Sequence, residues 1–260
     1  MTAAKPPHVK ALNDQSVLIL GGTSGIGLAC ARAFLSEDAQ VTLVGRNASR
    51  GAVAAAELGP KAGYVQADCT DPPALEATIT ETCERMGAID TMIVSLGGNR
   101  LPELLFKQSL ADVQASIIQD IAPFLLAGRA VLPVMMEQHG GTILNIASDA
   151  GKVATPGETV IGAGMAAIMQ FTRGLAIEGK RNGIRANTIT PSLVEGTPLT
   201  HRLMAEGTFS AKLFAKARPL ADLGPTTAED LAALAVFLAS PAAAKITGQA
   251  ISVNGGISAA

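Results

Sequence analysis

A glycine-rich loop is the feature that most restricts what this chain can fold into. The loop Gly21-Gly22-Thr23-Ser24-Gly25-Ile26-Gly27 follows the apolar run Ser16–Leu20 and opens a helical pattern. Its glycines permit a tight turn and a close approach of the backbone to a ligand. Because a helix begins with unpaired N–H groups and a partial positive charge, this context predicts a pyrophosphate site. The spacing differs from the usual dinucleotide fingerprint, and a turn that merely needs small residues is the alternative. The predicted contacts are Gly21, Thr23, Ser24, Gly25, Ile26 and Gly27.

Short apolar runs alternate with longer helical patterns along the rest of the chain. The runs are typical of strands in a parallel sheet whose two faces are both covered by helices. We therefore predict a Rossmann-type α/β fold, doubly wound, with a mostly parallel seven-stranded sheet and helices on both faces. The predicted strands are Ser16–Leu20, Gln40–Gly45, Ala62–Gln66, Ile89–Ser95, Thr142–Ala147, Ile184–Thr190 and Gln249–Val253. The predicted helices are Gly25–Ser36, Ala48–Leu58, Pro72–Met86, Leu110–Gln138, Glu158–Lys180 and Thr227–Leu238.

No linker or repeat interrupts this alternation, so residues 1–260 are predicted to form one domain with a loose tail over residues 1–11. Pro123 and Pro133 fall inside the longest helical pattern, and each is expected to kink or divide it. Residues 191–225 follow a strand end, show no clear strand and carry several apolar side chains. Open α/β sheets bind ligands at strand carboxyl ends, so we predict that this segment is a substrate lid. An ordinary surface excursion is the alternative.

The charges nearly cancel: 20 Lys and Arg against 22 Asp and Glu leave a formal net charge of −2. Such a chain lacks the positive patch expected of a protein that binds nucleic acid or an acidic membrane face. Cys30, Cys69 and Cys83 lack metal-ligand spacing and are expected to be reduced thiols, with no metal site. No apolar run of the roughly 18 residues needed for a membrane span is evident, and no signal sequence opens the chain. We expect a cytoplasmic protein.

Arg46 stands where a dinucleotide-binding chain usually carries an acid. That acid lies about 20 residues past the glycine loop and holds a ribose hydroxyl. Here the second predicted strand ends in Gly45-Arg46-Asn47. An arginine can pair with a 2′-phosphate, whereas a carboxylate would repel it. The sequence thus favours NADP(H) over NAD(H), with a solvated surface arginine as the alternative.

With these residues in place, the chain resembles the short-chain dehydrogenase/reductase family over nearly its whole length. The loop matches the family's TGxxxGxG except that Leu20 replaces the threonine, and Gly248–Gly256 resembles its last strand. Val94-Ser95-Leu96-Gly97 keeps only the glycine of the NNAG turn, and Pro191-Ser192-Leu193-Val194 has Ser192 in place of a glycine. The resemblance implies that Asp68 contacts adenine. The implied cofactor residues outside the loop are Arg46, Asp68, Cys69, Ser95, Gly97, Pro191 and Val194.

The catalytic positions depart from the family pattern. Ser148, at the end of Gly141–Ser148, corresponds to the family's catalytic serine. The family places a tyrosine about thirteen residues further on and a lysine four beyond that, but this chain has Ile161 and Met165 there. The only tyrosine of the chain is Tyr64, on the third predicted strand. The resemblance also aligns the family's catalytic asparagine with Asp120.

Isoleucine and methionine cannot donate a proton, so the usual contribution of general acid–base catalysis, about 10² to 10⁴ in rate, must come from elsewhere. Asp120, Asp149, Lys152 and Glu158 lie in segments that the resemblance places around the site. Asp120 beside an apolar wall is expected to have a raised pKa and to act as an acid. Ser148 and Asp120 are the catalytic candidates, and ordinary surface charges are the alternative.

Three functions stay open on the sequence. The first is an NADP(H)-dependent oxidoreductase for a small carbonyl or alcohol substrate, with an unusual proton donor. The second is an inactive binding or scaffold protein on the same fold, and the third is a non-redox enzyme, an isomerase or dehydratase. Loss of the lysine is expected to weaken NADP(H) binding about ten- to a hundredfold. The ligand is expected to be apolar, and the family resemblance implies a homodimer or homotetramer formed through the two long helices.

Overall fold

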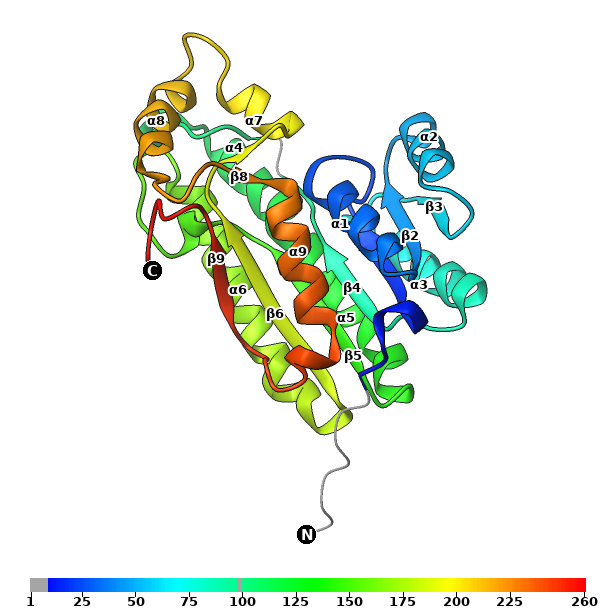
Figure 1. Ribbon diagram of the computed structural model, residues 1–260. Coiled ribbons are helices and arrows are strands. Elements are labelled where there is room, and N and C mark those ends of the chain that lie inside the picture. Colours follow the sequence, from blue (N-terminus) through cyan, green and yellow to red (C-terminus); the bar gives the residue numbers. More distant parts are fainter. Residues whose placement is uncertain (1–8, 98–99) are drawn as a thin grey trace.

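Seven parallel strands form one sheet in a computed structural model that describes residues 9–97 and 100–260. The strand order is β3-β2-β1-β4-β5-β6-β9, and every neighbouring pair is parallel (Figure 1). This order reverses direction at β1, as in a doubly wound fold. The predicted fold class is therefore confirmed. The strands are β1 Ser16–Leu20, β2 Gln40–Gly45, β3 Ala62–Gln66, β4 Thr91–Val94, β5 Gly141–Ile146, β6 Ile184–Pro191 and β9 Ala250–Val253.

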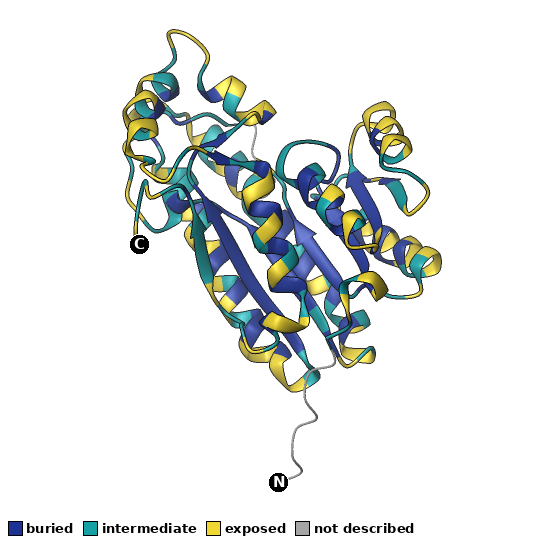
Figure 2. Cartoon of the chain, in the orientation of Figure 1, coloured by how far each residue is buried: buried dark blue, intermediate teal, exposed yellow. Residues whose placement is uncertain are grey.

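Helices cover both faces of this sheet because its central strands are apolar on both sides. In β1, Val17 and Ile19 pack into one core and Leu18 and Leu20 into the other, and all four are fully buried. Successive side chains of a strand point to opposite faces, which explains this division. Figure 2 shows the central strands of the sheet as buried. The first core contains α1 Gly25–Ser36, α2 Ala48–Leu58 and α9 Ala228–Ala239. The second contains α3 Pro72–Met86, α5 Ala122–Glu137 and α6 Thr159–Gly179.

The longest predicted helix is divided at one of its two prolines. It consists of α4 Leu110–Ser116, a π-helical turn η3 Ile117–Ile121, and α5, with Pro123 in the first turn of α5. Helix α5 continues through Pro133 to Glu137, so Pro133 does not divide the helix, and a kink at this residue stays a prediction. Pro133 is exposed, so the carbonyl group it leaves unpaired faces water.

The segment 191–225 contains more structure than the sequence predicts. A two-residue strand, β7 Val194–Glu195, pairs with β8 Thr226–Thr227, which corrects the expectation of no strand. Two helices follow β7, α7 Pro198–Leu203 and α8 Phe209–Ala217, and η6 Arg218–Leu220 follows them. A small core of Leu193, Leu203 and Phe214 holds this segment together, and Leu101 packs against it. Figure 1 shows α7 and α8 above the carboxyl ends of the strands.

Two helical segments have the length and hydropathy of a membrane span, which the sequence was predicted to lack. Leu110–Glu137 and Thr159–Asn182 are long and apolar enough to cross a membrane, judged by length and composition alone. A core helix of a folded domain passes the same test, so this finding is weak evidence of a span. Phe124, Val131 and Ile168 of these helices are fully or almost fully buried against the sheet.

The described part of the predicted N-terminal tail is attached to the sheet. Residues 1–8 lie outside the described residues. Lys10 forms an ion pair with Asp90 over 2.9 Å, and the 3-10 turn η1 Leu12–Asp14 follows it. The tail is thus fixed to the fold at least from Lys10 onward.

Candidate functional site

A cavity of about 540 Å³ lies at the carboxyl ends of the strands, under α7. The loops after β1, β2, β3, β4, β5 and β6 all contribute to its lining. Every predicted cofactor residue lines it except Gly27, and so do the catalytic candidates and the two residues that replace the family pair. The lining residues among those predictions are Gly21, Thr23, Ser24, Gly25, Ile26, Arg46, Asp68, Cys69, Ser95, Gly97, Asp120, Ser148, Ile161, Met165, Pro191 and Val194.

The glycine loop forms one end of this cavity, here called the glycine-loop end. Gly21 has φ +81°, and a Cβ there would overlap the carbonyl oxygen of Ser95. Gly27 is buried, and a Cβ on it would overlap the carbonyl oxygen of Gly21. Gly27 therefore packs under the loop and does not face the cavity. Gly25, with φ +53°, is open on the cavity side, where the nearest atoms to an added Cβ are 3.8 Å away on Thr197 and Pro198.

Helix α1 begins at this loop without a side-chain cap. Ser24 is its N-cap residue, but its hydroxyl accepts no bond from the first turn, as far as the described residues show. Asn47, Ser109 and Thr227 do cap their helices in this way. The first N–H groups of α1 are thus left for another acceptor, and helix N-termini of this kind bind anions.

Two arginines and one aspartate complete the glycine-loop end. Arg46 is exposed and borders the cavity, and Arg50 donates from Nε to Thr23 Oγ1 over 3.3 Å. Asp68 accepts from the N–H and the hydroxyl of Thr70 at 2.9 and 2.8 Å. The backbone hydrogen bond from Thr70, with a smaller contribution from the charge of Arg46, lowers the pKa of Asp68. Arg50 was not predicted from the sequence. Its position four residues after Arg46, in the first turn of α2, could have indicated that the two side chains lie near each other.

The opposite part of the cavity, here called the Ser148 end, holds the residues that depart from the family pattern. Ser148 begins the 3-10 turn η4 Asp149–Gly151, and its Oγ accepts from the N–H of Ala150 at 3.2 Å. Ile161 and Met165 lie one turn apart on α6 and both face the cavity. They present an apolar wall to it.

Asp120 lies on the π-helical turn η3 and faces the same space. In η3 the N–H of Ala122 donates to the carbonyl of Ile117, the five-residue spacing of a π-turn. Such turns often occur at functional sites. Asp120 Oδ1 is buried and has no hydrogen-bond partner among the described residues. Burial raises the pKa of Asp120, and the charge of Arg100 opposes this shift.

Asp149 and Lys152, two of the residues considered as replacements for the family's tyrosine and lysine, do not line the cavity. Lys152 donates to the carbonyl of Ala250 at 3.0 Å and to the hydroxyl of Ser252 at 2.8 Å. Asp149 is buried and accepts from Ser252 and Ser258 at 2.9 Å each. The turn η4 directs both side chains toward β9 and the C-terminal residues, so their part is to hold that segment in place.

Glu158, the third substitute, does line the cavity. Burial raises the pKa of its carboxyl, and a side-chain hydrogen bond with Thr155 opposes this shift. Other lining residues were not predicted, because nothing in the sequence gives the direction of a loop side chain. The polar ones are Arg50, Thr70, Arg100, Ser116, Gln119, Ser192, Thr197, Thr200 and Arg202.

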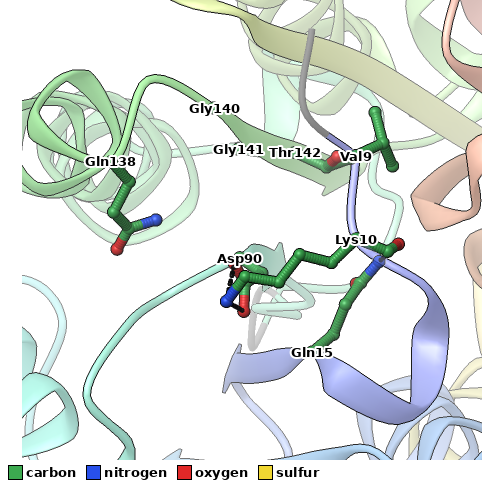
Figure 3. Close-up of a pocket in the computed structure, with 8 residues that line it drawn as sticks. All are labelled: Val9, Lys10, Gln15, Asp90, Gln138, Gly140, Gly141 and Thr142. Carbon is green, nitrogen blue, oxygen red and sulfur yellow. Dashed lines mark hydrogen bonds and ion pairs between the residues drawn. The ribbon is translucent and has the colours of Figure 1, made fainter.

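A second, smaller cavity of about 180 Å³ lies at the amino ends of the strands (Figure 3). Lys10 reaches Asp90 across it, and Gln15, Gln138 and Thr142 complete its polar lining. Gln138 bonds both backbone groups of Ile89, so its amide serves the fold. None of the predicted site residues lies here. Within residues 9–97 and 100–260, no group of three or more His, Cys, Asp or Glu is arranged to hold a metal ion.

Known proteins are similar to this chain over almost its whole length. Residues 21–258 match the sequence profile of the family described as Enoyl-(Acyl carrier protein) reductase. The 3-oxoacyl-[acyl-carrier-protein] reductase FabG of Vibrio harveyi is 31% identical over 248 residues, which cover 95% of this chain and 98% of that protein. The 2-(S)-hydroxypropyl-CoM dehydrogenase 3 of Xanthobacter autotrophicus is 32% identical over 259 residues, with the same coverage of 95% and 98%.

A solved structure is also similar to this chain over almost its whole length. A short-chain type dehydrogenase/reductase from Mycobacterium ulcerans has a TM-score of 0.86 to this chain at 25% sequence identity. The match covers 94% of this chain and 90% of that one.

Proposed function

Because the chain belongs to the short-chain dehydrogenase/reductase family, we propose that it is an NADP(H)-dependent oxidoreductase that interconverts a small carbonyl compound and its alcohol. The names of the two relatives, a 3-oxoacyl reductase and a hydroxypropyl dehydrogenase, both describe this type of conversion. The observation that carries the proposal is the position of Asp120. It places a carboxyl with a raised pKa in the same cavity as Ser148.

The glycine-loop end fits a dinucleotide phosphate. The first turn of α1 is uncapped, and Gly25 leaves open space beside it. Arg46 and Arg50 would hold the 2′-phosphate of NADP(H) with charge-assisted hydrogen bonds. Asp68 is ionised at neutral pH and would contact the adenine. When bound, the nicotinamide supplies or accepts a hydride.

Asp120 would supply the proton in the direction of reduction. A buried carboxylate oxygen without a hydrogen-bond donor is costly, so burial favours the protonated acid at Asp120. The carboxyl of Asp120 would donate its proton to the carbonyl oxygen of the substrate, and the hydroxyl of Ser148 would orient that oxygen. In the direction of oxidation the Asp120 carboxylate accepts the proton from the alcohol.

The apolar wall favours a second candidate function. Ile161 and Met165 remove the usual proton donor and the usual contact to the nicotinamide ribose. A protein that binds NADP(H) without turning over substrate, as a sensor or scaffold, would tolerate this wall. In that case Asp120 would be only a partly buried helix residue.

We also propose that the protein is a homo-oligomer and is cytoplasmic. Exposed apolar side chains on the long helices support the oligomer: Leu110 is 90% exposed on α4, and Ile117, Ile118 and Ile177 are more than half exposed on η3 and α6. Exposed apolar surface of this kind is typical of an interface between subunits. We also propose that residues 191–225 act as the lid of the cavity, since α7 contributes Leu199 and Leu203 to its lining.

Titration and turnover separate these functions. The purified protein is titrated calorimetrically with NADPH and with NADH, and NADPH oxidation is then followed over a panel of carbonyl substrates. Binding of NADPH together with turnover supports the oxidoreductase. Binding without turnover of any panel member supports the sensor or scaffold. If neither cofactor binds, both functions are contradicted.

A further inference from the structure

Arg100 is a charged residue at the Ser148 end that the proposed chemistry does not use. It follows β4 and lines the large cavity together with Asp120 and Glu158. Its side chain is 24% exposed, yet its Nε is buried and has no hydrogen-bond partner among the described residues. A buried donor without an acceptor is costly and calls for an explanation.

The guanidinium of Arg100 is held in a fixed position by the start of α4. Its Nη1 pairs with Oδ1 of Asp112 at 2.9 Å, and Oδ2 of Asp112 accepts from the hydroxyl of Ser109 at 2.7 Å. The hydrogen bond from Ser109, followed by the one from Arg100, lowers the pKa of Asp112 to about 2. Asp112 is therefore ionised at any neutral pH and anchors one side of the guanidinium. The edge that bears Nε is the other side.

Asp120 does not satisfy this edge. Its carboxyl is near enough for the charge of Arg100 to act on its pKa. If the two side chains were paired, Nε of Arg100 and Oδ1 of Asp120 would share a hydrogen bond. Instead each is left without a partner. The site thus holds an acid and a guanidinium in one cavity, each with one buried polar atom that has no partner among the described residues.

The remaining charges at this end also favour an anion. Burial raises the pKa of both Asp120 and Glu158, which favours their neutral forms. Arg100 then carries a positive charge at this end of the cavity. Its partner Asp112 is on the solvent side, since its side chain is 51% exposed and does not line the cavity. A planar guanidinium binds a carboxylate through two N–H groups on one edge.

We propose that the carbonyl substrate carries a carboxylate, which binds the Nε edge of Arg100 while the reacting carbonyl lies between Ser148 and Asp120. This assignment rests on the proposed oxidoreductase function and names the class of its substrate: oxo acids and the corresponding hydroxy acids. Arg100 is then a specificity-determining residue, and Ser109 and Asp112 position it.

The test compares oxo acids with their methyl esters at matched chain length, using NADPH as reductant. We expect kcat/KM to be at least about tenfold higher for the acids, since a charge-assisted pair is lost with the ester. Arg100→Gln should bring the ratio of kcat/KM for the acid to kcat/KM for its ester down to about one, chiefly by raising KM for the acid. Loss of the Arg100 charge near Asp120 acts on acids and esters alike, so this ratio is the readout. Arg100→Lys, which keeps the charge but not the planar fork, should keep only part of it. Arg129→Gln, on the exposed side of α5, is the matched control and should keep all of it.

Each result either supports or overturns the carboxylate site at Arg100. Equal turnover of acids and esters, or a full preference in Arg100→Gln, overturns the anion site and leaves the oxidoreductase function standing. If no carbonyl is turned over, that function fails separately, and the site is tested by titrating the NADPH-loaded protein with hydroxy acids. Binding that disappears in Arg100→Gln but not in Arg129→Gln then supports the site, and no binding to the native protein overturns it. Thermal melting of each variant confirms that it is folded.

Discussion

The two ends of the large cavity differ in what they keep of the family pattern. At the glycine-loop end, the loop, the uncapped start of α1 and Asp68 are all present. At the Ser148 end only the serine remains, and Ile161 and Met165 stand where a tyrosine and a lysine are usual. The chain as a whole has a TM-score of 0.86 to a solved short-chain type dehydrogenase/reductase, so the difference lies in side chains on a shared fold.

This difference shows which features depend on side chains. Phosphate binding at a helix N-terminus uses backbone N–H groups, so it needs glycines and a fold. Proton transfer uses one side chain of suitable pKa within reach of the substrate. The second requirement can be met from a neighbouring element, and we propose that the π-helical turn η3 meets it through Asp120, while the first cannot move without a change of fold.

The largest expected effect is at the Ser148 end. Asp120→Asn should lower kcat for carbonyl reduction by about 10² to 10⁴, because the amide cannot give up a proton. NADPH affinity should change little. Glu137→Gln, an exposed change at the end of α5, is the control. Steady-state rates at saturating NADPH measure the effect, and a native rate in Asp120→Asn would remove Asp120 from the mechanism.

The next effect is at the glycine-loop end. Arg46→Ala and Arg50→Ala should each weaken NADPH binding by about ten- to a hundredfold, since each removes a charge-assisted hydrogen bond. NADH, which lacks the 2′-phosphate, should bind these variants as it binds the native protein. Calorimetric titration checks both, with Arg181→Ala on the exposed turn η5 Lys180–Asn182 as the control. An equal loss for the two cofactors would argue against a 2′-phosphate site.

A smaller effect is a gain in cofactor affinity at the Ser148 end. Met165→Lys should tighten NADP(H) binding by about tenfold, because the new ammonium can reach the nicotinamide ribose. Met165→Leu should leave affinity unchanged and controls for the change of shape. Unchanged or weaker binding in Met165→Lys would show that the Ser148 end has been rebuilt beyond the two substituted side chains.

The smallest effect is on the pH dependence of stability. The pKa of Asp120 is raised by burial, so the folded state holds this proton more tightly than the unfolded state. The contribution of Asp120 to the free energy of unfolding therefore falls as pH rises from its unfolded pKa through its folded pKa. Urea denaturation between pH 3 and 8 should show this fall in the native protein relative to Asp120→Asn. A difference that is constant with pH would contradict the raised pKa.

Much of the fold could be predicted because the apolar runs and the residues at the helix starts indicate the same elements. The bounds of β1, α1, β2, α2, β3 and α3 are those predicted, since the glycine loop, Asn47 and the pair Pro72-Pro73 mark the helix starts. Whether Pro133 divides the helix could not be predicted, because its exposure, which makes the lost hydrogen bond tolerable, is a tertiary property. The two-residue pairing of β7 with β8 was likewise too short to leave a periodic pattern.

The site could be predicted only where a motif fixes the backbone. The glycine loop was found from its own motif, and Asp120 was found from its alignment with the family's asparagine; both line the cavity. Lys152 was placed in the wrong surroundings because the turn η4 directs it to Ser252 and not to the cavity. Arg100 was missed because only the contact with Asp112 shows which way its side chain points.

In the proposed function, Asp120 donates the proton that the family pattern assigns to a tyrosine. Nuclear magnetic resonance of protein labelled with ¹³C at the aspartate carboxyl groups, titrated with NADP⁺ present, tests it without knowledge of the substrate. The account predicts one carboxyl signal that titrates above the usual range for aspartate and disappears in Asp120→Asn. If the signal lost in Asp120→Asn titrates at or below that usual range, Asp120 is not the proton donor.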